Sequence, residues 1–159
     1  MTDALVALRA VTNADRAAGD ELLADFYSRW QNDPLVMDKW LALQATCALP
    51  GTLERVQELM QHSSFSMKNP NKVRSLIGAF CSNQHQFHAK DGKGYSFLVD
   101  CIMELDPMNP QVAARMLSPF TRWKQYDEQR QQLMKAALEQ IASLPGLSRD
   151  TGEIVEKSL

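Results

Sequence analysis

The sequence predicts an all-α fold, a HEAT- or armadillo-like right-handed superhelix of paired antiparallel helices. Apolar residues recur at spacings of three and four through nearly all of the 159 residues, as on one face of an amphipathic helix. No segment combines β-branched residues with the two-residue alternation of a strand. Asx-Pro pairs recur 36 and 40 residues apart, starting at positions 33, 69 and 109. A period near 40 residues with two helices per unit is typical of HEAT and armadillo repeats.

The helices are expected in the order of their apolar stripes, most of them about three turns long. The stripes lie at 5–11, 22–30, 35–47, 53–60, 73–80, 95–105, 112–120, 133–141 and 154–155. The glycine- and histidine-containing segment 82–94 is expected to be an irregular loop with a broken helical turn. Ser148 is expected to start a short terminal helix that caps the array, with Glu153 reinforcing that start.

The three Asx-Pro pairs carry the repeat signal. An Asx side chain accepts hydrogen bonds from the first amides of a helix, and proline suits the first helical position. The helix after each pair carries a basic residue four or five positions beyond the proline, namely Lys39, Arg74 and Arg115. Equivalent positions of a solenoid line one face, often the concave one, so these residues form a candidate basic face. Ordinary solvated cations fit the same pattern, and chance placement of a common dipeptide is the alternative to a repeat.

Composition places residues 1–159 in the class of single globular domains. The formal net charge is −2 with both signs interspersed, which argues against a nucleic-acid partner. The apolar runs are short and no signal peptide is visible, so we expect no membrane partner and a cytoplasmic location. Cys47, Cys81 and Cys101 sit among apolar neighbours and are expected to be buried thiols in a reducing compartment.

The sequence contains no recognisable catalytic motif. Gly-x-Ser-x-Gly, Walker and Gly-x-Gly-x-x-Gly patterns are absent, and so is the His-Glu-x-x-His pair of a zinc peptidase. His85, His88 and Asp91 are spaced to share a helix face, but no fourth zinc ligand is near and a Gly-x-Gly turn follows. We therefore expect both histidines to be solvated loop residues. No catalytic residue, metal ligand or cofactor is predicted in this chain.

Longer stretches resemble the C-terminal helical-repeat domain of bacterial aminopeptidase N, a zinc-dependent alanyl aminopeptidase of the gluzincin superfamily. They keep their order and cover the chain nearly end to end. The stretches are Leu22–Tyr27, Asp33–Trp40, Asn69–Phe80, Phe87–Ala89 with Asp91-Gly92 and Gly94-Tyr95, Asn109–Ala113, and Ala136–Gln140. Segment 82–86 is one residue shorter than the family pattern, so the contacts of that loop do not carry over.

The resemblance implies a domain without chemistry of its own. In the family, another domain of the same polypeptide holds zinc with the two histidines of His-Glu-x-x-His and a downstream glutamate, and it removes N-terminal residues from peptides. The helical domain closes the catalytic cleft, lines an internal substrate chamber and limits access to it. Zinc is then a cofactor of the parent enzyme, the catalytic domain is the partner of this chain, and the isolated chain is inactive.

The resemblance also assigns a few residues. The family's Asn-Pro-Gln-Val-Ala-x-Arg motif directs its glutamine and arginine toward the chamber, which matches Gln111 and Arg115, four residues apart on one helix face. The arginine of the Arg-Ser-Leu-Ile-Gly stretch, Arg74, faces the same chamber. Lys39 is a weaker candidate, which comes from the repeat pattern of basic residues and not from the resemblance. Such a cationic wall would hold the C-terminal carboxylate of a peptide substrate. The alternative is a free-standing helical-repeat adaptor that binds a peptide or protein on its concave face.

Overall fold

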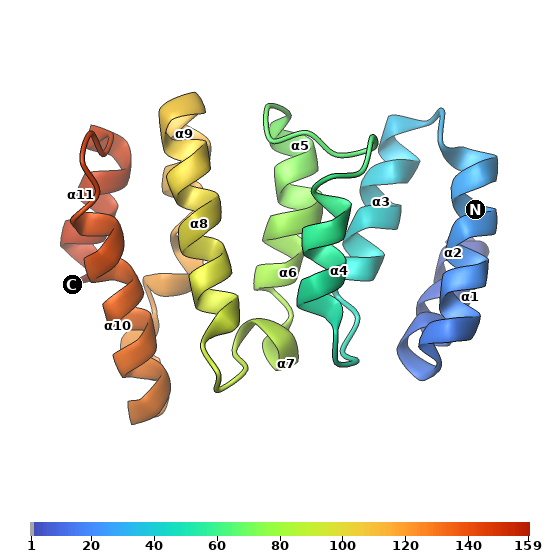
Figure 1. Cartoon of the computed structure of the whole chain (residues 1–159), viewed down its shortest axis with the longest axis horizontal. Helices are drawn as coiled ribbons and strands as arrows, with labels where there is room; N and C mark the ends of the chain where they lie inside the picture. Colours follow the sequence, from blue (N-terminus) through green and yellow to red (C-terminus); the bar gives the residue numbers. More distant parts are fainter. Residues whose placement is uncertain (1) are drawn as a thin grey trace. The chain divides into compact units, whose positions relative to one another are not determined.

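Every regular element in the part of the chain that the computed structural model describes, residues 2–159, is helical (Figure 1). This confirms the all-α prediction. The helices gather into two compact units, Met1–Gln86 and Phe87–Leu159, each of which has its own core. Among residues 2–159, no helix has both the length and the apolar composition needed to cross a lipid bilayer.

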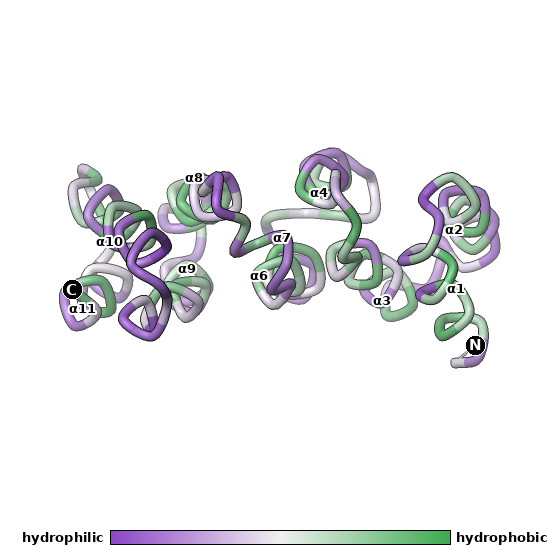
Figure 2. The backbone as a smooth tube through the Cα atoms, turned by 90° about the horizontal axis from the view of Figure 1, so that it is seen from below, coloured by the Kyte–Doolittle hydropathy of each residue, from purple (hydrophilic) through white to green (hydrophobic). Residues whose placement is uncertain are grey.

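The first unit consists of packed helix pairs. Its segments are α1 (Thr2–Ala14), α2 (Arg16–Trp30), α3 (Pro34–Ala45), α4 (Thr52–Leu59), α5 (Pro70–Val73), the π-helical turn η1 (Arg74–Gly78) and α6 (Ala79–Cys81). Helix α1 packs on α2 and α3 packs on α4, while η1 and α6 continue α5 along the side of α3. Figure 2 shows hydrophilic and hydrophobic residues alternating around each helix as it turns, the pattern that amphipathic helices need to share one core.

Two close contacts fix the start of this unit. A Cβ at Gly19 would lie 2.8 Å from the Cα of Thr12, so only glycine lets α1 and α2 approach this closely. The indole nitrogen of Trp40 donates a 3.1 Å hydrogen bond to the carbonyl of Leu23, which ties α3 to α2 and satisfies a buried donor.

The second unit is a two-by-two arrangement of helices. Its segments are α8 (Lys93–Met108), α9 (Pro110–Met116), the 3₁₀ turns η2 (Ser118–Phe120) and η3 (Trp123–Gln125), α10 (Glu128–Ala142) and α11 (Arg149–Ser158); the short α7 (Gln84–Phe87) straddles the boundary between the units. Helix α8 packs on α9 and α10, and α11 packs on the same two helices from the other side. Each helix therefore contributes one face to a shared core.

The structure also revises parts of the predicted arrangement. The boundary between the two units separates α5–α6 from α8, two stretches that the 40-residue period assigns to one repeat. Segment 82–94 is a loop that holds one short helical turn, α7, as expected, and Gly92, at φ 75°, is the N-cap of α8. The three cysteines are buried and form no disulfide, as predicted, and burial raises the pKa of Cys81 to about 12.

Candidate functional site

The three Asx-Pro pairs start helices in the structure, as the sequence predicts. In each pair the side-chain oxygen of the Asx residue accepts a hydrogen bond from the amide three residues later, at 3.2 Å for Asp33, 3.5 Å for Asn69 and 3.2 Å for Asn109. Proline occupies the first helical position every time, where its missing N–H leaves no partner unsatisfied.

The segments that follow these pairs also bury the same positions. The second, third, sixth, seventh and tenth residues after the proline are buried in all three, and the tenth residues are Gln44, Phe80 and Phe120. This shared register is what repeats require, because each repeat presents the same face to its neighbours. The agreement argues against chance placement of the dipeptides.

The shared register places the predicted basic residues in two different positions. Lys39 and Arg115 are the fifth residues after their prolines, whereas Arg74 is the fourth. One residue is a rotation of about 100° around an α-helix, so Arg74 corresponds to Asp38 and Ala114. Lys39 and Arg115 therefore occupy equivalent positions of their repeats, and Arg74 does not.

All four candidate chamber residues have exposed side chains. Gln111 and Arg115 lie four residues apart on α9 in the second unit, while Arg74 and Lys39 belong to the first unit. Within residues 2–159, no carboxylate lies at ion-pair distance from any of the three cations. Their charges are therefore not neutralised inside the domain, and they are available to an anionic group.

Arg74 sits at a local irregularity that the sequence does not signal. It opens the π-helical turn of residues 74–78, and its guanidinium donates a hydrogen bond to the side-chain oxygen of Asn71, one turn earlier. Single π-helical turns inside α-helices are frequent at functional sites. Asn71 therefore restricts the orientation of the candidate cation.

Sequence reasoning missed a buried ion pair between the first two Asx-Pro helices. The Nζ atom of Lys72, a residue only 9% exposed, lies 2.6 Å from Oδ1 of Asp38 and donates a 2.9 Å hydrogen bond to the carbonyl of Pro34. The Oδ1 contact lacks the alignment of a hydrogen bond, so it is an ion pair only. A signal was present, since Lys72 occupies a core position that Val36 and Val112 fill in the other repeats.

His88 is buried, so the expectation of a solvated loop residue is wrong for it, while His85 is exposed as expected. The Nδ1 atom of His88 lies 2.7 Å from the hydroxyl of Tyr95, and Nε2 lies 3.2 Å from that of Tyr126. The His88 and Tyr126 rings are stacked at 4.5 Å, so the bond to Tyr95 is the better directed of the two. Burial and the positive charge of Arg130 lower the pKa of His88 below its usual 6.5.

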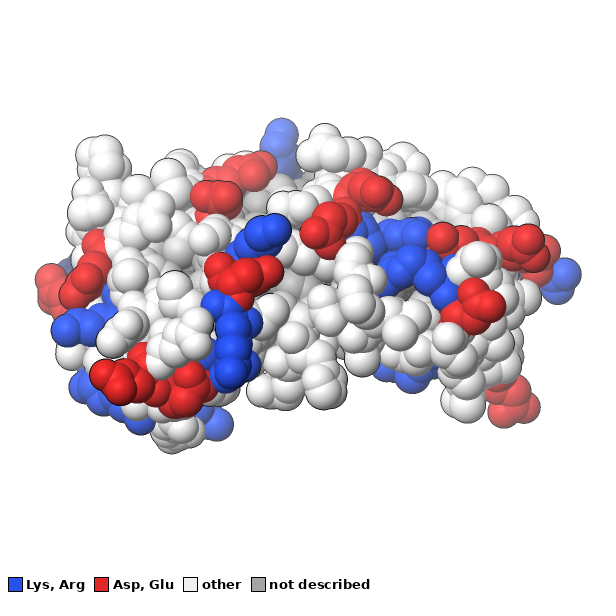
Figure 3. Space-filling view, turned by 60° about the horizontal axis from the view of Figure 1, so that its bottom comes forward, with Lys and Arg blue, Asp and Glu red and all other residues white. Residues whose placement is uncertain are grey.

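The arrangement offers binding groups and no reactive cluster. Across residues 2–159, no three histidine, cysteine, aspartate or glutamate side chains are grouped so that they could hold a metal ion. On the face drawn in Figure 3, lysine and arginine atoms lie beside aspartate and glutamate atoms. That mixture differs from the single-sign stripe of a nucleic-acid-binding surface.

Comparison with known proteins identifies the family. Residues 1–159 match the family model described as "Domain of unknown function (DUF3458_C) ARM repeats". The whole chain is 50% identical to aminopeptidase N of Escherichia coli (strain K12) and of Haemophilus influenzae, and 38% identical to aminopeptidase N of Caulobacter vibrioides. It spans 18% of the length of each of these relatives.

The fold has a solved counterpart. A crystal structure of Legionella pneumophila aminopeptidase A in complex with aspartic acid superposes with a TM-score of 0.96 at 37% identity, over 99% of this chain and 18% of that one. The chain therefore belongs to the ARM-repeat family DUF3458_C, and its resemblance to the C-terminal helical-repeat domain of bacterial aminopeptidase N is confirmed.

Proposed function

We propose that this chain is the non-catalytic C-terminal domain of a cytoplasmic zinc aminopeptidase, which removes N-terminal residues from peptides. The observation that carries the proposal is the 50% identity to aminopeptidase N over the whole chain. Because the chain spans less than a fifth of those relatives, the peptidase chemistry would belong to the rest of the polypeptide. The buried thiols suit a reducing compartment such as the cytoplasm.

The role that we propose for the domain is to close the catalytic cleft, line the substrate chamber and limit access to it. Gln111, Arg115 and Arg74, with Lys39 as a weaker candidate, would supply the chamber wall. Support comes from their exposed side chains and from the lack of an ion-pair partner for the cations within residues 2–159. Guanidinium groups bind carboxylates well, so this wall would hold the C-terminus of a peptide.

The described residues do not fit a zinc site, since they provide no group of three suitable ligands. Zinc would therefore be held entirely by the rest of the parent enzyme, which would supply a Lewis acid and an activated water. A reading frame that joins this chain to a His-Glu-x-x-His motif would distinguish the proposal from a free-standing adaptor.

The test is a substrate comparison in the full-length enzyme. Arg115→Ala and Arg74→Ala should each raise KM for short peptides about tenfold, as expected for the loss of one charge-assisted hydrogen bond. They should leave turnover of a small alanyl amide that lacks a C-terminal carboxylate nearly unchanged. Lys157→Ala, an exposed cation on α11, is the control. Equal losses on both substrates would contradict carboxylate binding.

A second measurement tests whether catalysis belongs only to the rest of the parent enzyme. The purified chain 1–159 should hydrolyse no alanyl substrate, with or without added zinc. Robust zinc-dependent turnover by the fragment would contradict the proposal that it is non-catalytic.

A further inference from the structure

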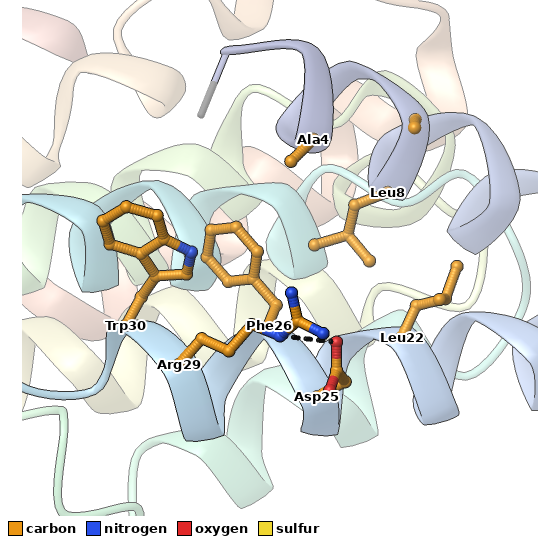
Figure 4. Close-up of a pocket in the computed structure, with 8 residues that line it drawn as sticks. Ala4, Leu8, Leu22, Asp25, Phe26, Arg29 and Trp30 are labelled. Atoms are coloured by element: carbon orange, nitrogen blue, oxygen red, sulfur yellow. Dashed lines mark ion pairs between the residues drawn. The ribbon is translucent and has the colours of Figure 1, made fainter.

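The first helix pair carries an apolar groove. The cavity between α1 and α2 has a volume of about 170 Å³, and Figure 4 shows side chains from both helices pointing into it. Its apolar lining is Ala4, Ala7, Leu8, Leu22, Phe26 and Trp30. Leu22 is 43% exposed although it lines the groove, so the apolar surface opens to the outside.

The rim of the groove is polar. Asp25 and Arg29, one turn apart on α2, form a 3.1 Å ion pair beside the apolar residues (Figure 4). Both side chains are more than half exposed, so the pair adds little to the stability of the domain itself. An apolar centre with a polar rim is the usual composition of a protein contact surface.

The helix that forms one wall is too apolar to be an outer surface. Asp3 and Arg9 are the only charged residues among the 13 of α1, which buries only Leu8 and Thr12 and leaves Val6 65% exposed. The last helix, α11, provides the contrast, because half of its ten residues are charged and all five of these are exposed. Exposed apolar surface of this kind marks a contact with another part of a protein, so the outer side of α1 needs a cover.

The size of the groove limits what fills it. An apolar cavity of about 150 Å³ is enough to hold one benzene molecule, so this groove accommodates one aromatic or branched aliphatic side chain. In the relatives, the matched segment is 18% of the polypeptide, which leaves most of the chain as a covalently linked source of that side chain. A linked partner acts at a millimolar effective concentration, well above the concentration of a second copy.

We propose that the α1–α2 groove is a socket for one aromatic or branched aliphatic side chain from the rest of the parent polypeptide, which docks the helical domain against it. The inference rests on the proposed function only in taking this chain to be one domain of a longer enzyme. The Asp25–Arg29 pair forms a polar rim beside the docked side chain.

Cysteine labelling in the full-length enzyme tests the socket. Leu22→Cys places a thiol in the groove, and Ala24→Cys places one at an exposed position two residues away on the same helix. Alkylation by iodoacetamide is followed by mass spectrometry of peptide 17–29, which reports both positions whatever other cysteines the enzyme contains. Ala7→Cys, on the α1 wall, repeats the test if Leu22→Cys folds poorly.

The expected result is alkylation at position 22 that is at least about tenfold slower than at position 24, at every enzyme concentration. Equal rates at the two positions would overturn the socket. Protection that disappears on dilution would also overturn it, because it would identify a second copy as the occupant. Failure of the proposed function would instead appear in the peptide kinetics of Arg115→Ala, which this labelling does not measure.

Discussion

The hydroxyl of Thr151 in α11 donates a 2.6 Å hydrogen bond to the carboxylate of Asp106 in α8. The same carboxylate accepts two bonds from Ser148, at 2.8 Å from the amide and 2.5 Å from the hydroxyl. Asp106 is only 5% exposed, and a negative charge is favourable at a helix N-terminus. A single buried carboxylate therefore holds the start of the terminal helix against the rest of its unit.

Asp106→Asn should destabilise the second unit by about 2 kcal/mol at pH 7, because hydrogen bonds to a charged group are lost or weakened. Urea unfolding of the chain measures the loss. Asp100→Asn, at an exposed position of the same helix, should change stability by less than about 0.5 kcal/mol. Equal effects of the two substitutions would show that the Asp106 carboxylate contributes nothing specific.

The effect of Asp106→Asn should also depend on pH. Burial alone would raise the pKa of Asp106, but the hydrogen bonds from Ser148 and Thr151 outweigh it and hold the pKa below its usual 3.8. As the pH falls, the carboxyl of Asp106 therefore binds a proton at a higher pH in the unfolded chain than in the folded one. The contribution of Asp106 to stability is complete above pH 3.8 and is lost as the pH falls through the pKa of the folded state. The difference in the free energy of unfolding between the native chain and Asp106→Asn should therefore decrease as the pH falls below 3.8.

The terminal helix also illustrates what the sequence can predict. Ser148 does start α11, since its hydroxyl accepts a 3.3 Å bond from the amide of Thr151, and helix-start signals are local. Glu153 contributes to this start through a side-chain pair, since its carboxylate lies 2.8 Å from Nε of Arg149, the first residue of α11. The carboxylate that accepts hydrogen bonds from Ser148 is Asp106, 42 residues away, and no local pattern reveals a partner at that distance.

The same limit applies to the candidate site. Helix order, Asx-Pro caps and the exposed Arg115 follow from local spacing, which the sequence displays directly. The burial of Lys72 and His88 does not, because each depends on contacts made by another helix. The most useful indication of such a contact is a charged or polar residue at a position where the other repeats have apolar residues.

The Lys72–Asp38 pair leads to a prediction about coupling. Asp38→Asn should destabilise the first unit by about 1–3 kcal/mol, because it removes the negative charge that pairs with a buried ammonium group. Replacing both residues, as Asp38→Leu with Lys72→Met, should recover most of that loss, since apolar residues of similar volume can replace a buried ion pair. Urea unfolding of the native chain and of both variants measures this comparison, and Lys68→Met at an exposed position is the control. A double variant less stable than Asp38→Asn would contradict the prediction.

The His88 cluster predicts a pH dependence of the second unit. Because the pKa of folded His88 lies below 6.5, the unfolded chain binds more protons than the folded one as the pH falls below 6.5. Stability should therefore decrease from pH 7.5 to pH 5.5, the direction that proton linkage requires. Hydrogen exchange of α8 and α10 amides measures this directly.

Two substitutions separate His88 from other titrating groups. His88→Phe should cost about 1–3 kcal/mol at pH 7.5, because it leaves the buried hydroxyl of Tyr95 without its partner, and it should flatten the pH dependence. His85→Phe, at an exposed position, should preserve the pH dependence of the native chain. An unchanged slope in His88→Phe would assign the effect to another group.

Among single substitutions in the second unit, we expect alanine at Gly94 to lower stability the most. A Cβ at this position would lie 2.9 Å from the carbonyl carbon of Phe87, and because the obstacle is backbone, no side-chain movement relieves it. Gly94→Ala should therefore destabilise the unit by about 3 kcal/mol or more, through the separation of α8 from the segment that precedes it.

Gly152→Ala, in α11, is the matched control, because the nearest neighbour of its added Cβ would be the Cδ2 of Leu147 at 3.8 Å, an ordinary contact. There alanine should stabilise the helix by about 0.5–1 kcal/mol through its higher propensity. Thermal unfolding of both variants measures the contrast, and a Gly94→Ala protein as stable as Gly152→Ala would show that Phe87 does not pack where the structure has it.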